Sequence, residues 1–352
     1  SKSLDNYLEI KDNTIKFKNH KIKSNFKNNK FTINGSGKIK LQEIFEDINY
    51  SIDSDDKDFK FNSKLLLSEL NFNSQEYLKN FITNLDKTTT LKDQKIEINL
   101  DKKKLLINGQ GKIKFNNDFE DIKFKVLKIK NKFNFNTELD LDNTPFKINF
   151  LNFVKNDKSK TRIRFAGSYE PENSLDFEDI SIINENNRLI FKNIFLDKNN
   201  LIEKVEKVNL KFLDNQNKKN NILLKNIKQN KYQITGSSFN AEKLIDSLLV
   251  SKKDNNLKLF QNDIKISLNL KEVYLDNLYL VNDLNGNLNI KNNEIYAANI
   301  SGDFDNVNNL KFTVNTNDIG EKITTLFSSK AEPLVKKYKF IKGFEDSEEG
   351  FL

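Results

Sequence analysis

The sequence predicts a mostly β protein in which curved antiparallel meanders repeat along an elongated groove. Apolar and polar residues alternate with a period of two in many short segments, Asn, Asp and Gly cluster between these segments, and one stretch recurs further along the chain. This alternation places apolar residues on one face of a strand, and short polar connections favour antiparallel hairpins. We expect about five repeats and a few short capping helices.

The alternation is clearest in residues 31–41, where apolar residues and glycines share one parity and Lys38 and Lys40 share the other. Other segments with this pattern are residues 59–61, 95–98, 133–135, 147–150, 162–165, 265–268 and 288–290. Each of these segments predicts a strand with one apolar face.

An internal repeat is visible by eye. Residues 31–48 read FTINGSGKIKLQEIFEDI and residues 105–122 read LLINGQGKIKFNNDFEDI, an offset of 74 without gaps. Residues 165–180 form a weaker third copy, and Gly236 and Gly302 mark a fourth and a fifth. This recurrence predicts one structural unit of about 60 to 75 residues, with glycines at bulges or bends.

Three segments switch to helical spacing, after the possible capping residues Ser74, Asn240 and Asp318. Their apolar stripes are Leu78, Phe81, Ile82 and Leu85; Leu244, Ile245, Leu248 and Leu249; and Ile323, Leu326 and Phe327. We expect short helices that cover an end or edge of the sheet, with membrane-surface docking as the alternative. Residues 1–230 are thus predicted to form the repeated meander, and residues 231–352 a segment with two or three helices that continues the same sheet.

Composition limits what the charge means. The 58 basic and 50 acidic residues give a net charge of +8, but the basic residues are nearly all Lys, as A/T-rich codons favour. Contact with phosphates through Lys therefore receives little weight. Because the chain has no Met and begins at Ser1, we expect part of a longer protein. No apolar run approaches the roughly 18 residues of a membrane span, so any anchor is expected outside this sequence.

Candidate catalytic and metal-binding residues are few. His20 is the only histidine and no cysteine is present, so a general base or thiolate site is not expected. Asp140 and Asp142 have the spacing to face the same side of a strand, but a solvated outer face explains them better than a cation site. The acidic pair of Phe45-Glu46-Asp47-Ile48 recurs in residues 119–122, and an active site normally occurs once. We therefore expect no enzyme activity, no cofactor and no metal.

Nucleic acid binding is the alternative suggested by one lysine-rich region. Its lysines are Lys112, Lys114, Lys123, Lys125, Lys128 and Lys130, with Phe115, Phe124 and Phe133 between them. Lys and Phe occupy opposite parities through most of these strands, whereas a stacking platform needs both on one face. We expect no nucleic acid partner.

The long one-sided apolar surface remains to be explained, because few helices are available to cover it. A second sheet would close it into a dry sandwich, and acyl chains would fill it as a groove. Parity assigns the groove lining to Ile33, Ile39, Leu41, Phe59, Phe61, Ile107, Ile113, Phe115, Phe133, Phe135, Leu139 and Leu141. The alternative is a structural or adhesive β-repeat protein with a closed core.

Short motifs resemble those of the AsmA-like family of Gram-negative bacteria, which includes YhdP- and TamB-related proteins. They are the residues 236–245, GSSFNAEKLI, followed by Asn317-Asp318-Ile319-Gly320 and Lys342-Gly343, and they are similar to the alphaproteobacterial C-terminal region of that family. The resemblance covers about a third of the chain.

The resemblance implies a β-groove rod in the periplasm, tethered to the inner membrane by a segment outside this sequence. It implies lipid transport in the cell envelope and outer membrane biogenesis: phospholipid acyl chains would move between inner and outer membrane without catalytic residues, and envelope proteins would be among the partners. The Lys and Asn enrichment departs from that family.

Overall fold

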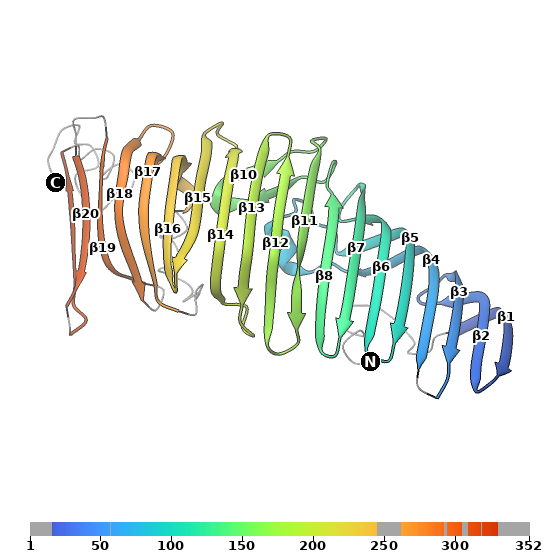
Figure 1. Cartoon of the computed structure of the whole chain (residues 1–352). Coiled ribbons are helices and arrows are strands. Elements are labelled where there is room, and N and C mark those ends of the chain that lie inside the picture. The colour runs from blue at the N-terminus through green and yellow to red at the C-terminus, as the bar shows by residue number, and fades with distance from the viewer. Residues whose placement is uncertain are drawn as a thin grey trace. The chain divides into compact units, whose positions relative to one another are not determined.

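The computed structural model describes residues 16–56, 58–244, 262–291, 294–304, 309–317 and 319–329. Most of these residues lie in strands, so the expected mostly β fold of antiparallel meanders is confirmed (Figure 1). The chain divides into two compact units, one of residues 1–147 and 155–185 and one of residues 148–154 and 186–352.

The first unit is built on long antiparallel strands. They are β1 (Lys16–Lys27), β2 (Lys30–Lys40), β3 (Phe45–Ser54), β4 (Phe59–Asn73), β5 (Thr88–Asp101), β6 (Lys104–Lys114), β7 (Phe119–Ile129), β8 (Lys132–Asp140), β11 (Thr161–Glu170) and β12 (Ser174–Asn184). Each pairs with the next along the chain, and β8 pairs with β11. The skipped residues hold β9 (Phe146–Ile148), the 3-10 helix η2 (Asn149–Leu151) and β10 (Phe153–Lys155).

The second unit continues the meander pattern with one exception. Its strands are β13 (Asn187–Leu196), β14 (Ile202–Leu213), β15 (Lys219–Lys228), β16 (Lys231–Asn240), β17 (Ile264–Tyr274), β18 (Leu280–Lys291), β19 (Glu294–Asp303), β20 (Asn309–Thr316) and β21 (Lys322–Ser328). Successive strands are antiparallel except β16 and β17, which are parallel. Val205, Tyr232 and Ile264 form a buried cluster of this unit.

Asparagine supports the tight hairpins. Asn28 and Asn29 connect β1 to β2 with φ angles of 52° and 56°. A two-residue connection with both φ angles positive matches the twist of the flanking strands, and Asn tolerates this left-handed conformation better than most residues. The abundance of Asn in the chain therefore suits a protein made of hairpins.

The sequence repeat corresponds to a structural repeat of four strands. The first and last residues of β6 each follow those of β2 by 74 positions in the sequence. The pairing of β1 with β2 has a register shift between Lys18 and Lys21, and the pairing of β5 with β6 has the equivalent shift between Lys92 and Lys95. The repeat thus begins at β1, earlier than the visible sequence match. In the weaker third copy Gly167 lies opposite Phe177, a register that the first two copies do not share.

Two kinds of glycine occur in the repeat. Gly37 and Gly111 lie opposite the two register shifts, where the sequence predicted bulges. Gly109 lies opposite Phe124 in an unbroken ladder, and a Cβ there would approach the ring to 2.1 Å. The ring of Phe124 therefore covers Gly109, as an aromatic residue does when it shields a glycine of a neighbouring strand.

The three predicted helices have different outcomes. After Ser74 only a 3-10 helix forms, η1 (Glu76–Asn80), with no side-chain cap. Residues 242–244 are helical and the Asn240 Oδ1 accepts the Glu242 backbone N–H at 3.1 Å, while residues 245–249 of that prediction lie outside the described residues. The prediction after Asp318 was wrong, because Lys322–Ser328 forms strand β21 against β20, which satisfies its backbone groups.

Candidate functional site

One face of the first unit carries the predicted groove residues. Ile98 lies opposite Ile107, Ile107 opposite Val126 and Val126 opposite Phe135, so these four form a row across β5 to β8. We call them the open strip. Each is half-buried and keeps part of its side chain accessible. Beyond β8, Phe135 packs near Phe177 of β12, with ring centroids 5.8 Å apart.

The same face is closed at the other end of these strands. Ile82, Ile113, Phe115, Leu139 and Leu141 are buried together, and we call them the closed cluster. Residues 74–87, the cover segment, supply Ile82 to it. Hydrogen bonds from the Asp86 N–H to the Phe115 carbonyl and from the Lys147 N–H to the Phe81 carbonyl, both 2.8 Å, hold that segment in place.

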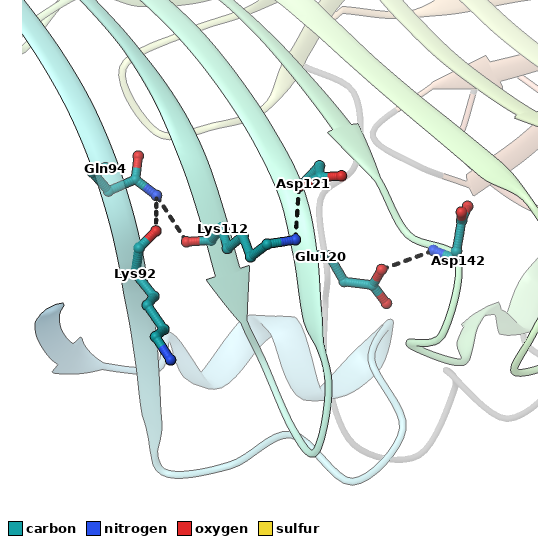
Figure 2. A network of polar contacts seen from close by, with 6 residues as sticks. All are labelled: Lys92, Gln94, Lys112, Glu120, Asp121 and Asp142. Atoms are coloured by element: carbon teal, nitrogen blue, oxygen red, sulfur yellow. Dashed lines mark hydrogen bonds and ion pairs between the residues drawn. The ribbon is translucent and has the colours of Figure 1, made fainter. Parts of the chain in front are cut away.

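A buried carboxylate secures the loop beside the closed cluster. Glu120 is 3% exposed and accepts the backbone N–H groups of Asp142, Asn143 and Thr144 at 3.0, 2.8 and 2.6 Å (Figure 2 shows the first). Lys155 is 1% exposed and donates to the carbonyls of Asp142 and Thr144 at 2.8 and 2.9 Å. Glu120 thus accepts backbone N–H groups of this loop, and Lys155 donates to its backbone carbonyls.

Burial lowers the pKa of Lys155, while attraction to Glu120, Asp142 and Asp157 opposes that shift. The equivalent acid one repeat earlier is Glu46, also 3% exposed. It accepts the Ser68 hydroxyl at 2.8 Å and the Glu69 N–H at 3.4 Å. The structural role predicted for the repeated acids is confirmed at both positions.

The twelve predicted groove residues divide into two groups. Ile39, Ile113, Phe115, Leu139 and Leu141 are buried core residues. Ile33, Leu41, Phe59, Phe61, Ile107, Phe133 and Phe135 are half-buried. Parity identified the face, but it did not identify the part of the face that is closed.

His20 has a structural position. Its Nε2 lies 3.0 Å from the Lys38 carbonyl, and Gln94, 74 residues later, donates to the Lys112 carbonyl at 2.8 Å (Figure 2). Because Lys112 is the repeat equivalent of Lys38, the two side chains make the same contact. Because glutamine makes this contact in the next repeat, hydrogen bonding to the backbone is sufficient to explain the presence of His20.

Asp140 and Asp142 both have hydrogen-bond partners within the protein. Arg162 donates from Nε to one oxygen of Asp140 at 2.7 Å and from Nη2 to the other at 3.2 Å, and this hydrogen bonding raises the pKa of Arg162. Asp142 accepts the Thr161 N–H at 3.2 Å. Across the described residues, no group of three or more His, Cys, Asp or Glu side chains is placed to bind a metal ion.

Sequence reasoning missed Lys155 and the depth of Glu120. The repeated Phe-Glu-Asp-Ile motif was a signal for Glu120, whereas Lys155 belongs to no repeated motif and had no signal of its own. Two surface hollows, one beside Ser36 and Asp47 and one beside Asp140 and Arg162, are lined mainly by polar residues and do not extend the open strip.

Comparison of the chain with protein-family models, curated proteins and solved structures found no match. Within the described residues, no helix combines the length and apolar character needed to cross a membrane.

Proposed function

We propose that this chain is a non-enzymatic lipid-binding or lipid-transfer segment of a periplasmic AsmA-like envelope protein, which carries phospholipid acyl chains between the inner and outer membranes. The observation that supports the proposal is the open strip. Its four side chains are apolar and in register, and none is buried, although the same face is closed at its other end.

The strip has dimensions that suit an acyl chain. Neighbouring strands lie about 4.8 Å apart, so four strands present a continuous apolar row about 14 Å long. Each CH₂ group that moves from water onto such a surface stabilises the complex by up to about 0.8 kcal/mol. Binding of this kind needs no catalytic side chain.

Cations lie near one side of the strip and would suit an anionic headgroup. The Lys128 Nζ is 5.0 Å from the ring centroid of Phe133, which is the neighbour of Phe135 on the same face of β8. Exposed Lys102, Lys103 and Lys104 lie at the connection between β5 and β6. A phosphate there would stay in water while its acyl chain lies on the strip.

The test is native mass spectrometry, with lipid extraction, of the chain purified from a membrane-containing host. We expect bound phospholipid, and we expect Phe61→Asp with Phe135→Asp to remove it while circular dichroism keeps its β signal. The matched control is Asn62→Asp with Asn134→Asp. These two residues are next to Phe61 and Phe135 on the same strands but have the opposite parity, so the control adds the same charges on the other face. Equal lipid in wild type and the Phe double variant would refute the proposal, as would an unfolded Phe double variant and folded Asn control.

The second candidate is a structural or adhesive repeat protein, which the closed cluster favours because it shows that part of this face does become dry. That function predicts a compact, stable chain without lipid. The same mass spectra therefore distinguish the two functions.

A further inference from the structure

The second unit carries an apolar row of its own across its strands. The pairing registers of β13 to β21 place one member of the row on each strand and set each member opposite the next. We call this row the second strip, and its members are Phe191, Val208, Leu224, Ile234, Leu268, Gly286, Ile300, Phe312 and Leu326. All of them are half-buried, and none has a polar side chain. The second strip is thus apolar and partly accessible over its whole length.

Buried residues border the second strip on both sides. On β20, Leu310 and Val314 are 9% and 3% exposed, while Phe312, which lies between them on the same face, stays half-buried. Phe153 of β10 closes part of one border, because its ring packs edge-on against Phe212 of β14 with the centroids 5.5 Å apart. Other buried residues that share a strand and a face with a member of the strip are Leu189, Leu210, Tyr232, Ile264, Leu270 and Ala298. The second strip is therefore an open line between two closed borders.

The chemistry and width of the second strip determine what can cover it. Each of the strands β14 to β20 is hydrogen-bonded to a neighbour on both sides, so the sheet offers no free strand edge along the strip. An extended polypeptide buried there would leave its own N–H and C=O groups without partners, which costs free energy. A helix is about 10 Å wide, whereas the buried neighbours of Phe312 lie about 7 Å along the strand on either side. A hydrocarbon chain is narrower than a helix and has no polar groups to satisfy.

We propose that the second strip is a second acyl-chain site, which holds about two hydrocarbon chains end to end. The strands β13 to β21 are separated by about 4.8 Å each, so the strip is about 38 Å long. The hydrocarbon core of a bilayer, which is two acyl chains deep, measures about 30 Å. This inference rests on the proposed lipid-binding function and adds to it a separate site with a larger capacity than the open strip. Polar headgroups stay outside the strip, because none of its side chains can bind them.

The experiment titrates the delipidated full chain with a fatty acid that carries a photoreactive diazirine at its methyl end. Native mass spectrometry counts the bound molecules, and peptide sequencing after irradiation locates the cross-links. We expect about three molecules per chain, about one on the open strip and about two on the second strip, as their lengths allow. Cross-links should fall in β5 to β8 and also in β13 to β21.

Two matched double variants test the second strip. Leu268→Asp with Phe312→Asp places charges on the strip and should lower the number of bound molecules by about two. The control, Asn269→Asp with Thr313→Asp, adds the same charges at the next residues of β17 and β20, on the opposite face, and should leave that number unchanged. The first-unit variant, Phe61→Asp with Phe135→Asp, should still bind about two added molecules, because its second strip is intact.

The outcomes separate this inference from the proposed function. Wild type that binds the fatty acid without cross-links in residues 187–328 would overturn the second site and leave the proposed function in place. A folded Leu268→Asp, Phe312→Asp chain that binds as many molecules as wild type would do the same. Circular dichroism shows whether this variant folds, and if it does not, the cross-links of wild type decide. Wild type that binds no fatty acid would overturn both the second site and the proposed function.

Discussion

The closed cluster and the open strip belong to one face of one unit, yet they differ in burial. On β8 and just beyond it, Leu139 and Leu141 are 8% and 2% exposed, whereas Phe133 and Phe135 are half-buried. All four share parity and apolar character. The difference lies in the cover segment, which packs Ile82 on the first pair. An apolar strand face therefore becomes core only where another segment reaches it.

The largest expected effect breaks the closed end. Glu120→Ala leaves three N–H groups of the 142–144 loop without their acceptor and removes one of the three negative charges that attract the buried Lys155. We expect a loss of about 3 to 5 kcal/mol in the free energy of unfolding, measured with denaturant, because three hydrogen bonds to a charged acceptor are lost. Glu46→Ala is the matched control and should lose less, about 1 to 3 kcal/mol, because Glu46 accepts fewer hydrogen bonds. Equal losses would contradict this account of Glu120 and Lys155.

Truncation of apolar side chains compares the two regions directly. Leu141→Ala removes a buried side chain of the closed cluster and should cost about 3 kcal/mol of stability. Ile107→Ala, in the open strip, should cost about 1 kcal/mol, because part of that side chain is already in contact with solvent. Denaturant unfolding of lipid-free protein measures both, and a larger loss for Ile107→Ala would show that the strip is core.

Lys155 makes the closed end depend on pH. The folded state lowers the pKa of Lys155, so the unfolded chain, with a Lys pKa of about 10.4, binds that proton more readily. Wild type should therefore gain stability relative to Lys155→Met as pH rises from the lowered pKa toward about 10.4, by at most about 1.4 kcal/mol per pH unit. A stability difference that does not change over this range would mean that Lys155 is not destabilised by burial.

The smallest effect concerns the two copies of the repeat. His20→Gln introduces the residue type found at the equivalent position of the next repeat, where Gln94 donates to the Lys112 carbonyl. We therefore expect the free energy of unfolding to change by no more than about 0.5 kcal/mol. His20→Ala should cost about 1 kcal/mol, since the hydrogen bond is lost. Unfolding midpoints measure both, and a large loss in His20→Gln with a small one in His20→Ala would show that the copies are not equivalent.

Strand positions were predictable because period-two alternation is a local property. Ile33 and Ile39 share a face in the sequence pattern and in β2, and the Gly37 bulge lies where glycine indicated one. Helix prediction failed at Ile323, Leu326 and Phe327 because three residues at helical spacing also fit a short strand. The pairing of Phe312 with Leu326 selected the strand, and no local signal reports such a partner.

The sequence by itself determined the mostly β class, the apolar face and the 74-residue repeat, since each follows from the order of residue types along the chain. Only the tertiary structure decided which part of that face is closed and that Glu120 and Lys155 bind one loop. These features depend on contacts of segments such as residues 74–87 and 142–144 with strands far from them in sequence. Burial and hydrogen bonding between distant segments depend on these contacts, so they arise only when the chain has folded.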